Sequence, residues 1–339
     1  MEVITGWTHK AFPIDDASRV GEARRYAGQL AREVGLSEVE TGQLSLVVTE
    51  LGTNLLRHAQ RGRLLVASRP ELSDIEVVSL DEGPGIADLA LAMQDGQSSG
   101  STPGTGLGAV RRLSSEFAIH STAPGGTVCV ARVRKGGSGQ AITDSRDFLL
   151  GAICLPAPGE SVSGDGWAVA IESGRLCLLV ADGLGHGSEA AKASQAAIAE
   201  FALSPSRQLQ EMIQRIHGAL RTTRGAAVCA LTMDARDSEL SYSGAGNIMG
   251  RIVSGVFDKS IVTQHGTAGA QIRRPEVATL ELPAHAIVVV HSDGIETRWK
   301  ADSVVGAMRL DPTVVAAILL RDHTRHRDDA TVVVLRRMI

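Results

Sequence analysis

Apolar positions in the chain follow two spacings, one typical of helices and one typical of strands. Over 17–34 they recur every three or four residues, which predicts an amphipathic helix with Val20, Ala23, Ala27, Leu30 and Val34 on its buried stripe. Ser37 and Glu40 have capping-box spacing, and an apolar stripe continues from there to Leu56, so a second helix is expected. Short apolar runs predict strands over 75–80, 127–133, 176–181, 287–291 and 331–335. These elements predict a mixed α/β (α+β) protein.

The length and one glycine-rich segment predict two domains. A chain of 339 residues is long enough for about two domains of ordinary size. The segment 135–140 (Lys-Gly-Gly-Ser-Gly-Gln) follows a finished strand pattern and is too flexible to hold regular structure. We therefore expect a domain over 1–134, a linker over 135–142 and a domain over 143–339. The halves share no repeat and carry different motifs, which indicates a fusion of unlike modules.

The composition limits the classes of partner that the protein could bind and the cellular compartment in which it is expected. With 43% hydrophobic residues, 21% charged residues and a net charge of −4, the chain offers no basic surface for nucleic acid or an anionic membrane. No apolar run reaches the roughly 18 residues needed to span a bilayer, and the N-terminus has no signal-peptide pattern. The cysteines lie inside apolar runs without zinc-binding spacing, at Cys129, Cys154, Cys177 and Cys229. A cytoplasmic protein with buried thiols is expected.

Two polar residues of the second predicted helix suggest a functional site. Glu50 and Asn54 are four residues apart, so both project from the same side of that helix. Such a pair alone is most often solvated surface. The strand over 75–80, however, runs directly into a turn that opens on Asp81, which could accept a hydrogen bond from an adenine amino group.

Glycines follow at places where backbone could approach a phosphate. Gly83 and Gly85 belong to the turn after Asp81, and Gly104, Gly106 and Gly108 open an apparent helix through 113. Backbone N–H groups at such a helix start can cradle phosphates. One glycine loop is weak support by itself, because ordinary turns use the same residues.

The order of these motifs is more specific than any one of them. Glu50-x-x-x-Asn54, Asp81-x-Gly-x-Gly, Gly104-x-Gly-x-Gly and Gly125-Gly126-Thr127 together resemble the nucleotide site of the GHKL ATPase fold over 15–134. The segments 88–96 and 110–113 look like those of the RsbT-type serine kinases within that superfamily.

This resemblance implies a GHKL/Bergerat α/β sandwich that binds ATP. Asn54 would hold a Mg²⁺ ion that bridges the ATP phosphates, Glu50 would orient or deprotonate the attacking hydroxyl, and Asp81 would read adenine. The remaining nucleotide-binding positions would be Gly83, Gly85, Gly104, Gly106, Gly108 and Thr127. A sensor histidine kinase would need a phosphoacceptor histidine on separate dimerisation helices, and the chain has no such region. Transfer to a protein serine or threonine is the better interpretation.

The second half carries aspartates where apolar runs begin or end. They are Asp165 in Ser-Gly-Asp-Gly, Asp182 in Asp-Gly-Leu-Gly-His-Gly, Asp293 in Ser-Asp-Gly and Asp328 in Asp-Asp-Ala-Thr. A single Asp-Gly pair is usually a plain turn. Carboxylates at the ends of packed strands can instead converge on hard cations such as Mg²⁺ or Mn²⁺. Two such ions, roughly 3.5–4 Å apart, can activate a shared water for attack on phosphorus.

These motifs, with Gly-Ala-Gly-Asn (244–247), resemble the metal-dependent PP2C-type phosphatases of the SpoIIE and RsbX branch over about 147–337. The resemblance implies a PP2C-type β-sandwich flanked by helices, with two Mn²⁺ or Mg²⁺ ions. Asp182 would bridge both metals, the Gly183 carbonyl would complete one site, and Asp293 and Asp328 would bind the other. Asp165 would ligate a metal or its water. Asp328 is preferred to Asp329 because the family places the ligand first. No arginine is assigned to hold the phosphate.

The combined prediction is a bifunctional cytoplasmic switch, an RsbT-like kinase joined to an RsbX-like phosphatase. Its substrates would be STAS-domain regulators, either RsbS/RsbR-like or anti-sigma-antagonist-like, as the resemblance implies. One alternative is a phosphatase whose ATP-binding domain only sequesters a partner, against which the intact Glu50 argues. A scaffold without activity is the other, and the complete acidic set argues against it.

Overall fold

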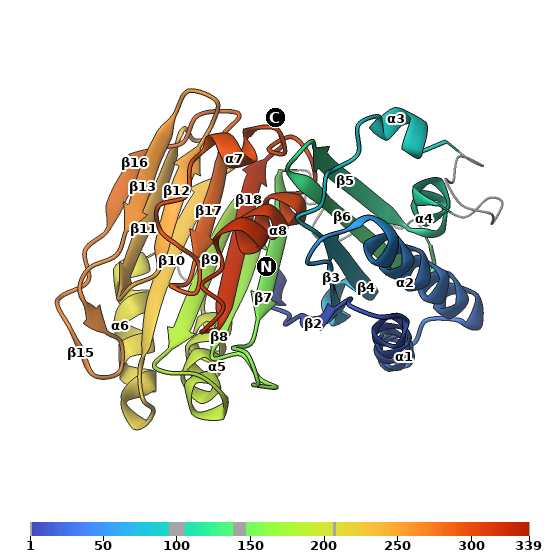
Figure 1. Cartoon of the computed structure of the whole chain (residues 1–339). Coiled ribbons are helices and arrows are strands. Elements are labelled where there is room, and N and C mark those ends of the chain that lie inside the picture. Colours follow the sequence, from blue (N-terminus) through green and yellow to red (C-terminus); the bar gives the residue numbers. More distant parts are fainter. Residues whose placement is uncertain (1, 95–105, 138–146, 206–207, 339) are drawn as a thin grey trace. The chain divides into compact units, whose positions relative to one another are not determined.

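The computed structural model describes residues 2–94, 106–137, 147–205 and 208–338. The chain divides into two compact units, each described by itself below (Figure 1). The inserted unit is His9–Ile142, and the sandwich unit combines Met1–Thr8 with Thr143–Ile339. None of the helices in the described ranges is both long and apolar enough to cross a membrane.

The inserted unit is an antiparallel sheet covered by helices. Its strands have the order β2-β3-β4-β6-β5. The strands are β2 (Lys10–Pro13), β3 (Arg63–Arg69), β4 (Asp74–Leu80), β5 (Glu116–Thr122) and β6 (Gly126–Arg134). The helices are α1 (Ala17–Val34), α2 (Glu38–His58), α3 (Leu89–Ala92) and α4 (Leu107–Leu113), with a 3-10 turn at Pro70–Leu72.

The predicted helices are confirmed, although α2 continues two residues beyond the expected end at Leu56. Asp16 caps α1 by accepting hydrogen bonds from the backbone N–H groups of Ser18 and Arg19, and Gly35 ends the helix at φ 77°. The expected capping box between Ser37 and Glu40 starts α2. The apolar stripes of both helices pack on one face of the sheet, against Leu64, Val66, Ile75, Val77, Cys129, Ala131 and Val133. Helical spacing therefore decided which side chains form this core.

The opposite face of the sheet carries a buried ion-pair network. Alternation along β4 directs Asp74 and Glu76 away from the helices, because Ile75 and Val77 point toward them. The Asp74 carboxylate lies 2.6 Å from Arg69 Nε and 3.0 Å from Arg134 Nη2. The Glu76 carboxylate lies 2.6 Å from Arg132 Nη2 and 3.0 Å from His9 Nε2. Each buried carboxylate thus has cationic or hydrogen-bonding partners.

Glu76 is expected to contribute stability that acid removes. Burial alone would raise the pKa of Glu76, but Arg132 and Arg69 hold it far below its usual range. Its contribution is therefore complete above the unfolded pKa of about 4.3 and is lost as the pH falls further. Glu76→Gln leaves buried arginines without this charge and is expected to cost about 3–5 kcal/mol at pH 7. Urea unfolding of both proteins between pH 7 and pH 2 should show that difference shrinking below about pH 4. A difference independent of pH would contradict this role.

The sandwich unit contains two packed sheets. One has the order β1-β8-β9-β10-β11-β16 and the other β13-β12-β17-β18-β7, with a small β14-β15 ladder beside them. Strands of the first sheet are β1 (Glu2–Thr5), β8 (Asp165–Glu172), β9 (Arg175–Gly183), β10 (Ala226–Asp234), β11 (Glu239–Ala245) and β16 (Ala278–Glu281). Strands of the second are β7 (Phe148–Leu155), β12 (Met249–Val253), β13 (Asp258–Val262), β17 (Ile287–His291) and β18 (Ala330–Arg337); the ladder is β14 (Gly266–Thr267) and β15 (Gln271–Ile272).

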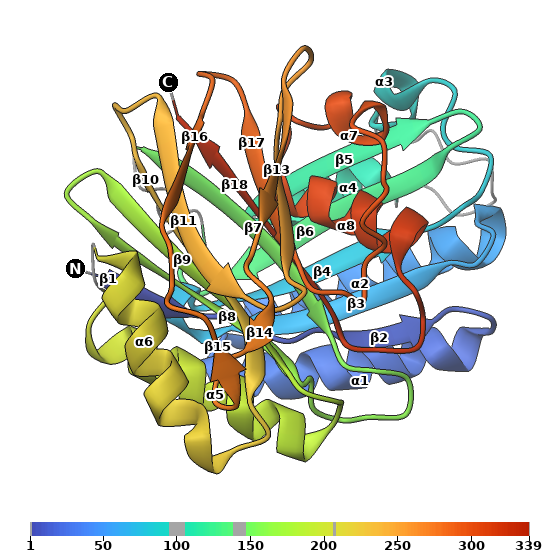
Figure 2. The same cartoon turned by 90° about the vertical axis from the view of Figure 1, so that its left-hand side faces the viewer.

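Helices cover the outer faces of this sandwich. Helices α5 (Ser188–Leu203) and α6 (Leu209–Ala219) lie along the first sheet (Figure 2). Their apolar side chains are buried against β8, β9 and β10. Helix α8 (Pro312–His323) packs on β7 and β18, and the apolar stretch 314–320 within it is buried. The short helix α7 is Asp302–Val305, and a 3-10 turn follows α6 at Leu220–Thr222. The strands predicted over 176–181, 287–291 and 331–335 are the central parts of β9, β17 and β18.

The first residues of the chain differ from the expected domain boundary. The predicted domain 1–134 included them, but β1 pairs antiparallel with β8, with Ile4 opposite Val169. Beyond β1, the Gly6 N–H donates to the Trp167 carbonyl (2.7 Å), and Trp7 packs edge-on against Trp167 with ring centroids 4.7 Å apart. A four-residue strand that pairs across such a sequence distance leaves no local pattern from which it could be assigned. Residues 138–142 of the expected linker lie outside the described residues.

Strand β1 is expected to stabilise the sandwich unit. Ile4 is 1% exposed, so Ile4→Ala should cost about 2–5 kcal/mol through the cavity it leaves. The tryptophans Trp7, Trp167 and Trp299 all belong to the sandwich unit, so their fluorescence during urea unfolding follows that unit alone. Val256→Ala, at a fully exposed valine, is the matched control and should leave the midpoint unchanged. Equal midpoints for Ile4→Ala and wild type would contradict a structural role for β1.

Candidate active sites

In the inserted unit, Glu50 and Asn54 lie one turn apart near the C-terminal end of α2. Both side chains are half-buried, between the apolar stripe that faces the sheet and the exposed side of the helix. Helix α2 contacts β4, β6 and α4, and β4 leads directly into Asp81. The polar edge of α2 is therefore held on the elements that carry the other predicted nucleotide-binding residues.

Asp81, Gly83 and Thr127 meet where β4 ends and β6 begins. The Asp81 N–H donates to the Thr127 carbonyl (3.0 Å), and Asp81 Oδ1 accepts a hydrogen bond from the Gly83 N–H (2.7 Å). The Thr127 hydroxyl lies 2.9 Å from that of Ser121, which accepts from the Ile86 N–H at 2.8 Å. Asp81 is 8% exposed, so it is buried among these polar groups.

The glycines have different local roles. Gly85 has φ +73°, and a Cβ there would lie 2.3 Å from the Thr122 carbonyl oxygen, so only glycine is accommodated. Gly106 caps α4 without a side-chain hydrogen bond, and Gly108 is buried within that helix. Gly104 lies outside the described residues.

In the sandwich unit, the predicted aspartates gather at one end of the two sheets. Asp165, the first residue of β8, is the cross-strand partner of Asp182 on β9. Asp293 follows β17, and Asp328 precedes β18 in the other sheet. Asp182, Asp293 and Asp328 line a cleft of ≈ 420 Å³, together with Asn247, Gly185 and His265. Strand ends from both sheets thus bring together residues up to 163 positions apart in the sequence.

Hydrogen bonds orient two of these carboxylates. The Ser292 hydroxyl donates to Asp165 Oδ2 at 2.6 Å, and the Asn247 amide donates to Asp293 Oδ2 at 2.6 Å. Asp329 Oδ1 instead accepts from the Ala157 N–H (2.8 Å), and its side chain is 3% exposed. Asp328, not Asp329, therefore faces the cleft.

The electrostatics of the cluster favour a cationic ligand. Burial raises the pKa of Asp182 far above its usual range, and the carboxylates of Asp165 and Asp293 raise it further. Burial likewise raises the pKa of Asp165, against the hydrogen bond from Ser292. Burial also raises the pKa of Asp293, with Asp328 adding to the effect. The carboxylates repel one another, and a positive charge among them would relieve that repulsion.

The donor chemistry fits divalent metal ions. As the side chains are placed, no three His, Cys, Asp or Glu groups of the described residues converge closely enough to hold one ion. Carboxylate and carbonyl oxygens are nevertheless the ligands that Mg²⁺ and Mn²⁺ prefer, and the cleft opens between three of them. Gly183 follows Asp182 in the sequence. A Cβ at Gly183 would lie 2.1 Å from the Ala190 carbonyl oxygen, so the absence of a side chain lets the backbone come close to α5. The oxygen donors around the cleft are therefore of the kind that divalent cations prefer.

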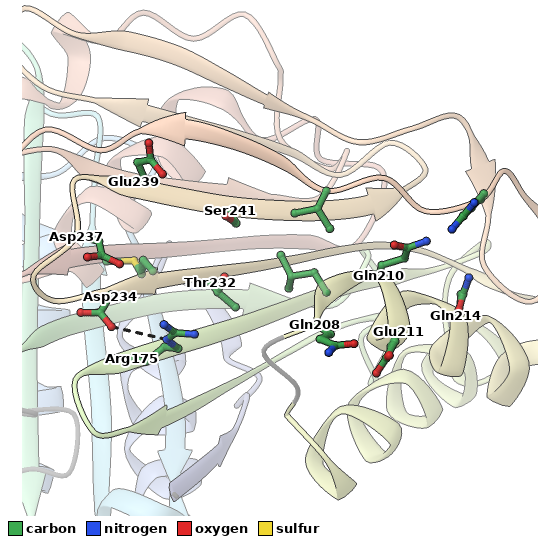
Figure 3. Close-up of a pocket in the computed structure, with 14 residues that line it drawn as sticks. Arg175, Gln208, Gln210, Glu211, Gln214, Thr232, Asp234, Asp237, Glu239 and Ser241 are labelled. Carbon is green, nitrogen blue, oxygen red and sulfur yellow. Dashed lines mark ion pairs between the residues drawn. The ribbon is translucent and has the colours of Figure 1, made fainter.

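A larger cleft lies away from this chemistry. It has a volume of ≈ 660 Å³ and is lined by α6 and by β9, β10 and β11 (Figure 3). Its walls are polar, with an ion pair between Arg175 and Asp234 at 3.7 Å. Arg175 begins β9, whereas Asp182 is next to its end, so this cleft is remote from the aspartate cluster. None of the predicted site residues lines it.

Sequence reasoning missed several residues of the phosphatase-like site. Asn247 and Ser292 were noticed only as parts of the motifs around them, although both donate hydrogen bonds to predicted ligands. Burial raises the pKa of Asp293, and the charges of Arg325 and Arg327 oppose that rise, which places positive charge beside the cluster. Their position just before Asp328 was the available signal.

Comparison with known families agrees with both units. Residues 12–132 match the histidine kinase-like ATPase domain family, and residues 172–338 match the stage II sporulation protein E (SpoIIE) family. Serine/threonine-protein kinase RsbT of Bacillus subtilis (strain 168) is 33% identical over 108 residues, which are 31% of this chain and 80% of RsbT.

The second half of the chain is similar to another Bacillus subtilis protein. Phosphoserine phosphatase RsbX of Bacillus subtilis (strain 168) is 32% identical over 95 residues, which are 28% of this chain and 47% of RsbX. The match therefore spans about half the length of RsbX. A crystal structure of RsbX in complex with magnesium shares the fold, with a TM-score of 0.52 and 20% identity over 57% of this chain and 97% of that one. The chain thus belongs to the RsbT family through its inserted unit, and it joins this kinase-type ATPase domain to a PP2C-like domain whose residues 172–338 match the SpoIIE family model.

Proposed function

We propose that the protein adds phosphate to, and removes it from, serine or threonine residues of STAS-domain regulators in a cytoplasmic partner-switching pathway. The observation that carries the phosphatase half is the convergence of Asp165, Asp182, Asp293 and Asp328 from two sheets. The kinase half rests on the gathering of Asp81, Gly83 and Thr127 beside the helix that carries Glu50 and Asn54. The free, buried cysteines fit a reducing cytosol.

In the phosphatase domain, Asp182 would bridge two Mn²⁺ or Mg²⁺ ions, with the Gly183 carbonyl in one site and Asp293 and Asp328 in the other. Asp165 would ligate a metal or its water. When bound, the ions supply an activated water and offset the charge of the phosphate ester. Ser292 and Asn247 orient two of the carboxylates through hydrogen bonds of 2.6 Å each. The aspartate-lined cleft opens beside Leu184, whose exposed side chain could contact a protein substrate.

In the kinase domain, ATP would bind between α2 and the turn after β4. Asp81, already accepting from Gly83, would receive the adenine amino group, while Gly85, Gly104, Gly106 and Gly108 would let backbone N–H groups approach the phosphates. Asn54 would hold Mg²⁺, and Glu50 would orient or deprotonate the attacking hydroxyl. Catalysis of this kind is mostly positioning and electrostatics.

The relatives support opposed activities on protein substrates. RsbT is named a serine/threonine-protein kinase and RsbX a phosphoserine phosphatase. A STAS-domain partner is the substrate class that the resemblance to these relatives implies, and a kinase and a phosphatase in one chain would act on it in opposite directions.

Two assays on the full-length chain test the proposal. Equilibrium dialysis should show Mg²⁺-dependent ATP binding, and a serine-phosphorylated STAS-domain protein should release phosphate with Mn²⁺ but not with EDTA. If neither the phosphorylated STAS-domain protein nor p-nitrophenyl phosphate releases phosphate, the phosphatase half of the proposal is contradicted. Absence of ATP binding would contradict the kinase half. ATP binding without transfer to any STAS-domain protein would instead indicate that the inserted unit is a partner-binding module.

A further inference from the structure

A buried chain of hydrogen bonds reaches Asp165 from the core of the second sheet. It runs from Trp299 through His291 and Ser292, three residues that are 2%, 1% and 0% exposed. The phosphatase chemistry described above uses Ser292 only as the donor to Asp165, and it uses neither Trp299 nor His291. The positions and chemistry of these three residues determine which group donates and which accepts in each hydrogen bond.

The tautomer of His291 follows from its partners. The indole N–H of Trp299 can only donate, and it lies 3.4 Å from His291 Nε2, so that nitrogen must accept. The proton of a neutral imidazole is then on Nδ1, which donates to the Ser292 carbonyl oxygen at 2.9 Å. Trp299 is itself held in place, because its ring lies 4.1 Å below the Arg251 guanidinium, which Asp258 anchors at 3.0 Å.

Ser292 is fixed from three directions. Its backbone N–H donates to the Thr331 carbonyl (3.1 Å), and its hydroxyl oxygen accepts from the Thr331 N–H (3.0 Å). Because that oxygen already accepts from Thr331, its own proton is directed to Asp165 Oδ2, 2.6 Å away. Ser292 thus links the second sheet, through β18, to the first residue of β8 in the other sheet.

We propose that Ser292 is a positioning residue that holds the Asp165 carboxylate in its metal-ligating orientation, and that His291 and Trp299 keep Ser292 in place. This inference rests on the proposed phosphatase function, in which Asp165 ligates a metal or its water. Hydrogen-bonding partners of metal ligands fix the ligand's orientation, and their loss typically weakens metal affinity or activity about 10–100-fold. Ser292 itself contacts neither metal nor substrate.

Direct Mn²⁺ binding tests the proposal without relying on turnover. Titration of full-length protein with Mn²⁺, followed by electron paramagnetic resonance of the free ion, gives the dissociation constant. Ser292→Ala is expected to raise it roughly 10–100-fold. The phosphatase kcat of Ser292→Ala should recover at saturating Mn²⁺, because the ligand itself remains, whereas that of Asp165→Asn should not. Ser243→Ala removes another buried serine hydroxyl, in β11, and should bind Mn²⁺ like wild type.

A second variant keeps the proposal testable should Ser292→Ala lower the stability. Trp299→Phe removes the N–H donor together with the pyrrole part of the indole and keeps an aromatic ring near Arg251, so it should weaken Mn²⁺ binding in the same direction but less. Far-UV circular dichroism establishes that each variant is folded. Wild-type Mn²⁺ affinity in folded Ser292→Ala, or in folded Trp299→Phe where Ser292→Ala does not fold, would overturn the proposal. If wild type and Asp165→Asn both bind no Mn²⁺, the proposed phosphatase function itself fails.

Discussion

Replacing Asp182 by asparagine is expected to abolish phosphate release while leaving ATP binding intact. Asp182 is the carboxylate that would bridge both metal ions; burial raises its pKa, and repulsion from Asp165, Asp293 and Asp328 raises it further. The amide is nearly isosteric but carries no charge, so it cannot serve as an anionic bridge. Losing metal-assisted activation costs several kcal/mol of transition-state stabilisation, which predicts a fall in kcat of about 10³-fold.

Single-turnover release of phosphate from a phosphorylated STAS-domain protein in Mn²⁺ measures this effect. Asp234→Asn is the matched control, because Asp234 belongs to the same sheet but lies beside Arg175 in the remote cleft. That variant should keep wild-type activity. Retention of more than about a tenth of wild-type kcat by Asp182→Asn would be incompatible with a metal-bridging role.

Glu50→Ala is expected to stop phosphate addition while leaving phosphate removal unchanged. Glu50 is half-buried on α2, one turn before Asn54, and in the proposed kinase it would orient or deprotonate a serine hydroxyl. A positioned general base contributes about 10²–10⁴-fold, and the rate of transfer from ATP should fall by that factor. The affinity for ATP should change little, since the glycine turns and Asp81 remain.

Transfer of labelled γ-phosphate to a STAS-domain protein measures this rate. An Asp293→Asn background prevents the label from being removed during the assay. Glu38→Ala changes an exposed glutamate at the opposite end of α2 and should transfer label normally. Unchanged transfer by Glu50→Ala would show that another group activates the hydroxyl. If none of these forms transfers label, the result would support the alternative in which the inserted unit only binds a partner.

Local patterns predicted the elements well because local physics produces them. The capping box at Ser37 and Glu40 and the apolar stripe of α2 each depend on residues within a few turns. The pairing of Asp165 with Asp182 could not be derived from spacing, since it depends on the register of β8 against β9. Only the participation of both residues in one metal site was expected, through resemblance to a phosphatase family.

Residues that act through long-range contacts were beyond sequence reasoning. Ser292 donates to a carboxylate 127 positions away, and nothing in the Ser-Asp-Gly motif specifies that direction. Strand β1 was assigned to the wrong unit for the same reason, because its partner β8 begins only at Asp165. The roles assigned to Glu50, Asn54 and the glycines remain predictions, and Gly104 lies outside the described residues.

One time course tests the joint presence of both activities most directly. Full-length wild type, Asp293→Asn and Glu50→Ala are each incubated with a STAS-domain protein, labelled ATP, Mg²⁺ and Mn²⁺, and the bound label is followed. We predict that label accumulates strongly with Asp293→Asn, stays low with wild type because it is removed again, and is absent with Glu50→Ala. Equal accumulation with wild type and Asp293→Asn would contradict a phosphatase that acts on the phosphosite made by the same chain.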